Sequence, residues 1–194
     1  MSRTLAVATA LALALPAAAQ QRPYIDVGSP TFQPLPIAVA DFQGEGDARG
    51  REVSDVVRSD LALSGVFDVL DPKGFLADPA EGYAAPAIRF ARWADVGAEG
   101  LAKARVRRAS AELEGELHLY EVRAGREALA TTVRTSAADP RALGHRIADE
   151  IVRYYTREPG VFSTRIVAIR KARGVYELVL FDSDGRNPRT LLSE

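Results

Sequence analysis

The stretch Leu35–Leu70, LPIAVADFQGEGDARGREVSDVVRSDLALSGVFDVL, decides the fold. Leu35–Phe42 is a compact apolar segment, and its composition predicts a strand buried on both faces. A helix is expected from Arg49 to Ser64, because apolar residues recur on one face, at Val53, Val56, Val57 and Leu61. Gly65 stands where the left-handed residue after a helix belongs, and Val66–Leu70 reads as the next strand. A strand, a helix and a strand at this spacing predict a βαβ unit with a parallel strand pair.

Downstream of this unit the pattern predicts a loop at 78–86, a short helix at Phe90–Val96 that contains Trp93, and a strand at Gly100–Arg107. Two longer strands are expected at Ala111–Val122 and Glu127–Ser136, joined at Ala124-Gly125. In the first of these, leucines alternate with glutamates and His118, which predicts an antiparallel hairpin with one solvated face. The alternation slips at Tyr120–Val122, so a β-bulge or register shift is expected there.

The next helix has the clearest boundaries. Asp139 is a good N-cap and Pro140 suits the first helical position. Its apolar face consists of Leu143, Ile147, Ile151 and Tyr154 or Tyr155. Pro159-Gly160 ends the helix, so residues 35–158 are predicted to form one α/β domain with a mixed sheet and helices.

The pattern changes after Gly160. Strands are predicted at Arg165–Lys171 and Val175–Phe181, and a third strand begins at Thr190. So few strands without a helix cannot bury both faces of a sheet. Residues 159–194 are therefore expected to expose apolar surface and to open a larger β-structure.

The N-terminus predicts export from the cytoplasm. Arg3 is followed by the uncharged apolar run Leu5–Leu15, then by Pro16 and small alanines. This order is typical of a signal peptide over residues 1–19, with Ala17 and Ala19 at the positions that signal peptidase recognises and Gln20 as the first mature residue. No cysteine follows the run, so lipid attachment is not expected. The apolar run is too short for a membrane-spanning helix, which needs about 20 residues.

The segment after the predicted cleavage site is an extended, proline-punctuated arm, residues 20–34. Tyr24–Val27 within it has the composition of a short strand, and the alternative is a disordered leader. The mature chain has 24 basic and 26 acidic residues, because Arg3 is the only charged residue among the first nineteen. A net charge near zero argues against nucleic acid or an anionic membrane as a partner.

No catalytic, cofactor or metal site is predicted. The chain has two histidines, His118 and His145, and both are interpreted as surface residues. His145–Glu150, HRIADE, lacks the second histidine of a helical zinc site. Asp182–Asn187 does not have the glycine and glutamate spacing of a calcium-binding EF-hand loop, so turn chemistry is the better interpretation.

Several segments together resemble the TolB family of the Tol-Pal system. Most specific are Gly160–Ile166, GVFSTRI, and Asp182–Pro188, DSDGRNP. Other matching segments are Tyr24–Gly28, Leu35–Val39, Asp60–Leu61 with Ser64–Phe67, Trp93 with Gly97, Leu119–Val122, His145–Asp149 and Tyr176–Leu178.

The resemblance implies a fold and a function. The fold would be an α/β domain of the anticodon-binding-domain type, followed by the first, incomplete blade of a β-propeller at 159–194. The function would be that of a monomeric, non-enzymatic periplasmic scaffold without a cofactor, reaching membranes through its protein partners. The arm residues Tyr24, Ile25, Asp26, Val27 and Gly28 would bind TolA, and the propeller would bind the lipoprotein Pal.

Two alternatives stay open at this stage. The chain could be the accessory part of an exported hydrolase with a propeller, which fold analogy does not exclude. A downstream GxSxG motif would favour that alternative, whereas further Asp-x-Asp-Gly repeats would favour the scaffold. The second alternative is a small-ligand site at the carboxyl ends of the parallel strands, near Asp41 and Asp71.

The predicted cleavage has a direct test. The exported protein should begin at Gln20, because Ala17 and Ala19 are small enough for signal peptidase. Intact-mass analysis of protein recovered from the periplasm measures this. The same chain made under inhibition of signal peptidase is the control and should keep its first nineteen residues. A recovered mass that still includes those residues without inhibition would contradict the prediction.

Overall fold

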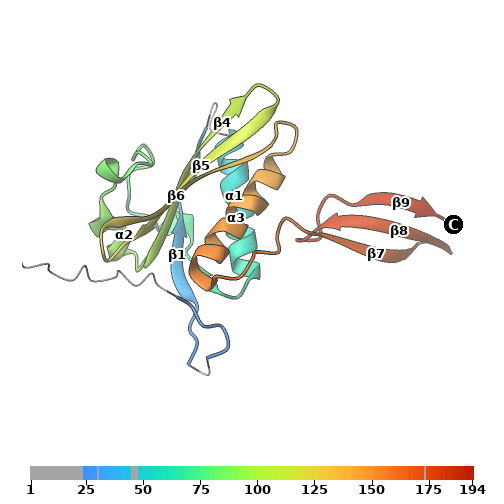
Figure 1. The fold of residues 1–194 in the computed structure, drawn as a ribbon, viewed down its shortest axis with the longest axis horizontal. Coiled ribbons are helices and arrows are strands. Elements are labelled where there is room, and N and C mark those ends of the chain that lie inside the picture. Colours follow the sequence, from blue (N-terminus) through green and yellow to red (C-terminus); the bar gives the residue numbers. More distant parts are fainter. Residues whose placement is uncertain (1–23, 30, 45–47, 173) are drawn as a thin grey trace, which may run out of the picture.

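The computed structural model describes residues 24–29, 31–44, 48–172 and 174–194 (Figure 1). The predicted signal peptide and the cleavage residues Ala17, Ala19 and Gln20 lie outside these ranges. The strands are β1 Leu35–Val39, β2 Gln43–Gly44, β3 Phe67–Val69, β4 Gly100–Ala109, β5 Glu112–Glu121, β6 Arg126–Ser136, β7 Arg165–Ala172, β8 Val175–Asp182 and β9 Arg189–Ser193. The helices are α1 Ala48–Leu63, α2 Phe90–Asp95 and α3 Pro140–Thr156, with short 3₁₀ turns at Pro72–Gly74 and Ala85–Ala87.

The first six strands form one mixed sheet in the order β3-β1-β4-β5-β6, with β2 pairing beside β4. The βαβ prediction is confirmed, because β1 and β3 pair in parallel with Leu35 opposite Phe67. β1 also pairs in parallel with β4, and β5 pairs antiparallel with both β4 and β6. The short strand β2 was not predicted, since Gln43–Gly44 reads as a turn.

Helices α1 and α3 lie side by side on one face of this sheet (Figure 1). Their apolar faces form the main core with the strands, and Val53, Val57, Leu143 and Ile147 are buried in it. The two helices approach closely at Gly144, where an added Cβ would lie 2.6 Å from Cβ of Val56. A glycine is therefore required at the crossing.

The other face of the sheet is covered by α2 and the long segment between β3 and β4. Trp93, Leu101 and Tyr120 lie in a second buried cluster there. Glu81 fixes the segment through its carboxylate, which accepts from Nζ of Lys103 (2.7 Å), Nε1 of Trp93 (2.9 Å) and the backbone N–H of Arg89 (2.8 Å). A charged pair thus holds a long connection in place.

The hairpin β5–β6 differs from its prediction in one respect. The alternation is correct and the register shifts between Leu119 and Tyr120, close to the expected bulge. The polar face is covered only in part, however: Glu114 is buried between Arg107 and Arg134 and His118 packs against Tyr83, whereas Glu112 and Thr132 are exposed as predicted. The alternation of apolar and polar residues shows that the two faces of a strand differ. It does not show whether a distant segment of the chain packs over the polar face.

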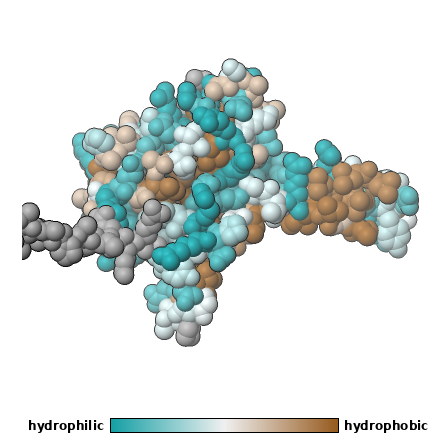
Figure 2. All heavy atoms as spheres, viewed as in Figure 1, coloured by the Kyte–Doolittle hydropathy of each residue, from teal (hydrophilic) through white to brown (hydrophobic). Residues whose placement is uncertain are grey.

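β7, β8 and β9 form a separate three-stranded antiparallel sheet, consistent with a partial propeller blade. Figure 2 shows apolar side chains gathered over it. The exposed residues include Ile166, Val167, Ile169, Tyr176 and Leu192. This confirms the expectation that so few strands leave apolar surface uncovered.

Among the described residues, none of the helices is long and apolar enough to cross a membrane.

The helix crossing generates a stability prediction. Gly144→Ala should lower the free energy of unfolding by about 1–3 kcal/mol, because the new methyl group overlaps Val56 and forces α1 and α3 apart. Gly74→Ala is the matched control, since nothing lies within 4 Å of its added Cβ, and it should change stability by less than about 0.5 kcal/mol. Urea unfolding measures both. Equal stability of the two variants would contradict the tight crossing.

The Glu81 pair generates a second stability prediction. Burial alone would raise the pKa of Glu81, but its bonds from Lys103, Arg89 and Trp93 outweigh burial and lower it. Because the folded-state pKa of Glu81 is below the unfolded value of about 4.3, its ionised carboxylate contributes to stability. This contribution is complete above about pH 4.3 and is lost as the pH falls through the folded pKa.

Glu81→Gln should therefore destabilise the protein by about 3 kcal/mol at pH 7, because it leaves the Lys103 ammonium buried without its counter-charge. The deficit relative to the unchanged protein should shrink as the pH is lowered below about 4. Urea unfolding at pH 7 and pH 3 tests this, with the exposed Glu158→Gln as control. A deficit that is the same at both pH values would argue against the charged pair.

Candidate partner-binding site

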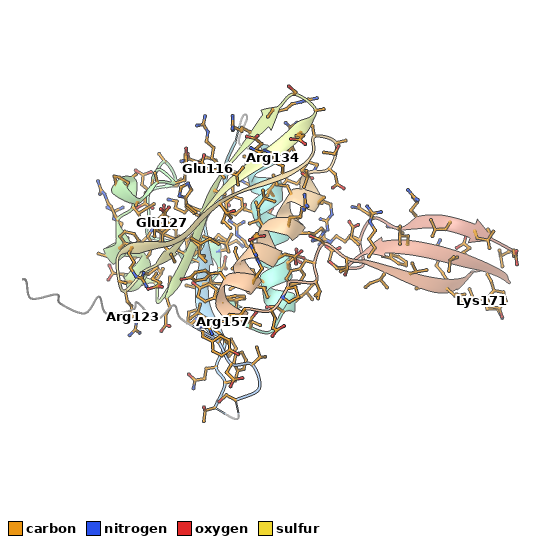
Figure 3. The ribbon with its side chains drawn as sticks, viewed as in Figure 1. Glu116, Arg123, Glu127, Arg134, Arg157 and Lys171 are labelled. Atoms are coloured by element: carbon orange, nitrogen blue, oxygen red, sulfur yellow. The ribbon has the colours of Figure 1, made fainter. Side chains whose placement is uncertain are left out.

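Of the five predicted arm residues, Tyr24–Gly28, the first two contact the C-terminal end of α3. The backbone N–H of Ile25 donates to the carbonyl oxygen of Tyr155 at 2.9 Å, and the Ile25 side chain packs partly into the main core. Figure 3 labels Arg157 where the start of the described chain meets the end of α3. The arm is therefore in contact with the domain.

The end of α3 offers this contact for a structural reason. The last carbonyls of a helix have no partner within the helix, so an incoming N–H can bind one of them. Arg157 ends α3 with a φ of 63°, and its N–H donates to the carbonyl of Arg153 at 3.0 Å. Its guanidinium lies 4.7 Å from the ring centroid of Tyr24, an attractive cation–π distance.

The arm does not form the strand that its composition suggested. Asp26 accepts the backbone N–H of Gly28 through its carboxylate (3.0 Å) and that of Ser29 through its carbonyl (3.2 Å), which bends the segment into a turn. The end of a helix supplies an isolated carbonyl acceptor, not the row of backbone donors and acceptors that a sheet edge offers. The arm therefore does not pair as a strand there. Tyr24 and Val27 both remain 53% exposed. Ile25 thus anchors the arm while two large side chains face solvent.

A second constellation was missed by sequence reasoning. His145 is 4% exposed, which makes its interpretation as a surface residue wrong. Its Nδ1 lies 2.7 Å from Oδ2 of Asp60, a fully buried carboxylate on α1. The turn after β8 adds Asp182 and Asp184, and Arg141 pairs with Asp184.

The pKa values of the buried pair are displaced. Burial disfavours the charged imidazolium of His145, but the hydrogen bond and charge of Asp60 outweigh it, so the His145 pKa is raised. Burial raises the pKa of Asp60, and the bond from His145 offsets only part of this effect. Both groups therefore hold protons more tightly than they would in water.

The sequence did contain a signal for this pair. Asp60 follows Val57 by three residues and Val56 by four, so it belongs to the buried stripe of α1. His145 precedes Ala148 by three residues, on the side of α3 that faces α1. An acid and a histidine inside two apolar stripes indicate a buried pair.

The proposed small-ligand site does not assemble. Asp41 pairs with Arg51 and Arg58, whereas Asp71 caps the 3₁₀ turn by accepting the N–H of Lys73 at 3.0 Å. A pocket of about 150 Å³ does lie beside Asp41, but Glu81 and Lys103 on its wall are already paired with each other. The two aspartates thus serve local structure.

Comparison with known proteins gives a family. Residues 23–128 match the model of the TolB amino-terminal domain. The chain is 69% identical to a protein named Tol-Pal system protein TolB from Anaeromyxobacter sp. (strain K), over 99% of this chain and 45% of that protein. It is 41% identical to the protein of the same name from Myxococcus xanthus (strain DK1622), over 96% of this chain and 44% of that protein.

A solved structure agrees with these relatives. The crystal structure of TolB from Acinetobacter baumannii superposes with a TM-score of 0.71 at 26% identity, covering 84% of this chain and 39% of that one. The chain spans about half the length of the curated relatives that it matches.

Proposed function

Because this chain belongs to the TolB family, we propose that it is a non-enzymatic interaction component of the Tol-Pal envelope complex. It acts in the periplasm after removal of residues 1–19, without lipid attachment. It links an inner-membrane partner of the TolA type to an outer-membrane partner of the Pal type. The relationship to proteins named Tol-Pal system protein TolB, over nearly all of the chain, carries this proposal.

The arm, residues 20–34, is the proposed TolA-binding element. Its described part supports this role, because Tyr24 and Val27 present exposed apolar side chains beside the domain. In the described part of the arm, one backbone hydrogen bond, from Ile25 to Tyr155, ties it to α3. An extended segment of this kind can pair with the sheet edge of a partner or stay docked on its own domain.

Residues 35–158 are proposed to form the domain that carries the arm, and residues 159–194 the first blade of a propeller. The exposed apolar residues of β7–β9 support a neighbouring blade as their cover. The surface that would bind a Pal-type partner is assigned to the propeller rather than to particular residues. The alternative of an accessory hydrolase domain gains no support from the relatives, which carry the Tol-Pal name.

Deletion of Tyr24–Gly28 in the full-length protein tests the role of the arm. The affinity for TolA, measured by isothermal titration calorimetry, should fall at least about tenfold, a loss of about 1.4 kcal/mol. The control is Leu76→Ala, which truncates an apolar side chain of similar exposure (58%) outside the arm. Unchanged affinity after the deletion, with the fold intact by circular dichroism, would exclude the arm as the TolA-binding element.

A further inference from the structure

Three buried polar atoms without a hydrogen-bond partner meet where α1 and α3 face the turn after β8. Oδ1 of Asp60 and Nε2 of His145 can face a cation, whereas the third, Nε–H of Arg141, is a donor whose nearby acceptor is Oδ2 of Asp182 at 3.7 Å. Buried polar atoms are nearly always paired, so a group of unpaired ones indicates a missing partner such as an ion or a water. This cluster is separate from the arm and plays no part in the proposed function.

The orientation of His145 defines what the missing partner must be. Nδ1 is held by Asp60 at 2.7 Å, so in the neutral imidazole the proton on Nδ1 is directed to that carboxylate and the lone pair of Nε2 points away from it. Oδ2 of Asp182 is 4.0 Å from Nε2, on the turn that also carries Asp184. Histidines that bind metals usually donate their other N–H to a carboxylate in this way.

We propose that His145, Asp182 and Asp184 bind a divalent transition-metal ion of the zinc type. One ligand atom from each of the three residues lies within 4.8 Å of the others. Ligand atoms on a tetrahedral zinc ion, at bond lengths of about 2.0–2.2 Å, are about 3.4 Å apart. On that geometry the Nε2–Oδ2 separation of 4.0 Å must close by about 0.6 Å, and a separation at the 4.8 Å limit by about 1.4 Å.

The ligand types decide the class of metal. An imidazole nitrogen with two carboxylates suits zinc and its neighbours in the first transition series, whereas calcium and magnesium prefer oxygen ligands throughout. The adjoining pocket, of about 290 Å³, is lined by His145 and Asp182 together with Ser136, Asp139, Ser163 and Thr164. It can admit the water that completes an open coordination sphere.

The local charges leave room for a cation. Asp60, Asp182 and Asp184 face the site, and against them stand Arg141 on α3 and the guanidinium of Arg186, 3.7 Å from Asp184 and mostly exposed. With His145 neutral, the buried part of the cluster has three carboxylates and one guanidinium. Arg141 stays as the outer partner of Asp184, since ligating carboxylates are commonly hydrogen-bonded.

A metal at this point would join two parts of the chain. His145 belongs to α3, whereas Asp182 and Asp184 belong to the end of β8 and its turn. The ion would therefore pin the three-stranded sheet to the α/β domain. Protection of the connecting residues 157–164 against proteolysis should rise when the metal binds.

Isothermal titration calorimetry tests the site: untagged, EDTA-treated protein is titrated with zinc chloride at pH 8. One zinc ion per chain should bind, and more weakly at pH 6, where protons compete for His145. His145→Gln and Asp182→Asn should both lose this binding. Asp182→Asn keeps the Asp60–His145 bond, so it stays informative if His145→Gln does not fold.

Two further variants separate ligation from general charge effects. Asp60→Asn should weaken zinc binding about 10- to 100-fold, because it changes the group that orients His145 rather than a ligand. His118→Gln is the matched control: His118 also has two glutamates beside it, Glu116 and Glu127, yet its loss should leave the binding unchanged.

Two results would overturn the proposal. The first is an absence of zinc binding at pH 8 by the folded protein, which would mean that a proton on His145 serves the cluster instead. The second is equal zinc binding by the folded Asp182→Asn variant and the unchanged protein.

Discussion

The contact between Gly144 and Val56 sets the position of α3, and much of the molecule depends on that position. With no side chain at Gly144, α3 lies directly on α1 and brings His145 to Asp60. The same helix provides Asp149, whose carboxylate accepts the N–H groups of Phe162 (2.8 Å) and Ser163 (3.0 Å) in the connection to the second sheet. Its last turn receives the arm at Tyr155. One helix therefore contacts α1, the arm and the connection to the second sheet.

Much of this fold could be predicted from the periodicity of apolar residues, because their spacing reflects which side of a helix or strand is buried. The stripes of α1 and α3, the Asp139 cap, the parallel pair and the three strands after Gly160 all follow from local spacing. Asp139 illustrates why: its carboxylate accepts the N–H of Ala142, three residues along the chain, at 2.9 Å. Interactions within one turn are visible in the sequence.

The remaining features depend on contacts between distant segments. Glu81 meets Lys103 across 22 residues and His145 meets Asp60 across 85, so local spacing does not identify the partners, although Asp60 and His145 each stand within an apolar stripe. The interpretation of His145 as a surface residue was wrong for this reason, and the cover over Glu114 and His118 was missed for the same reason. For the arm, the turn follows from the local bonds that Asp26 accepts, whereas its docking on the carbonyl of Tyr155 is a contact between distant segments.

The energetics of the arm explain how it can be docked and still available. Its contacts are one hydrogen bond to Tyr155, one exposed cation–π contact with Arg157 and partial burial of Ile25, together about 4 kcal/mol. Ordering the backbone of five residues costs at least about 5 kcal/mol. Since the two terms nearly cancel, a partner that binds Tyr24 and Val27 has little docking energy to overcome.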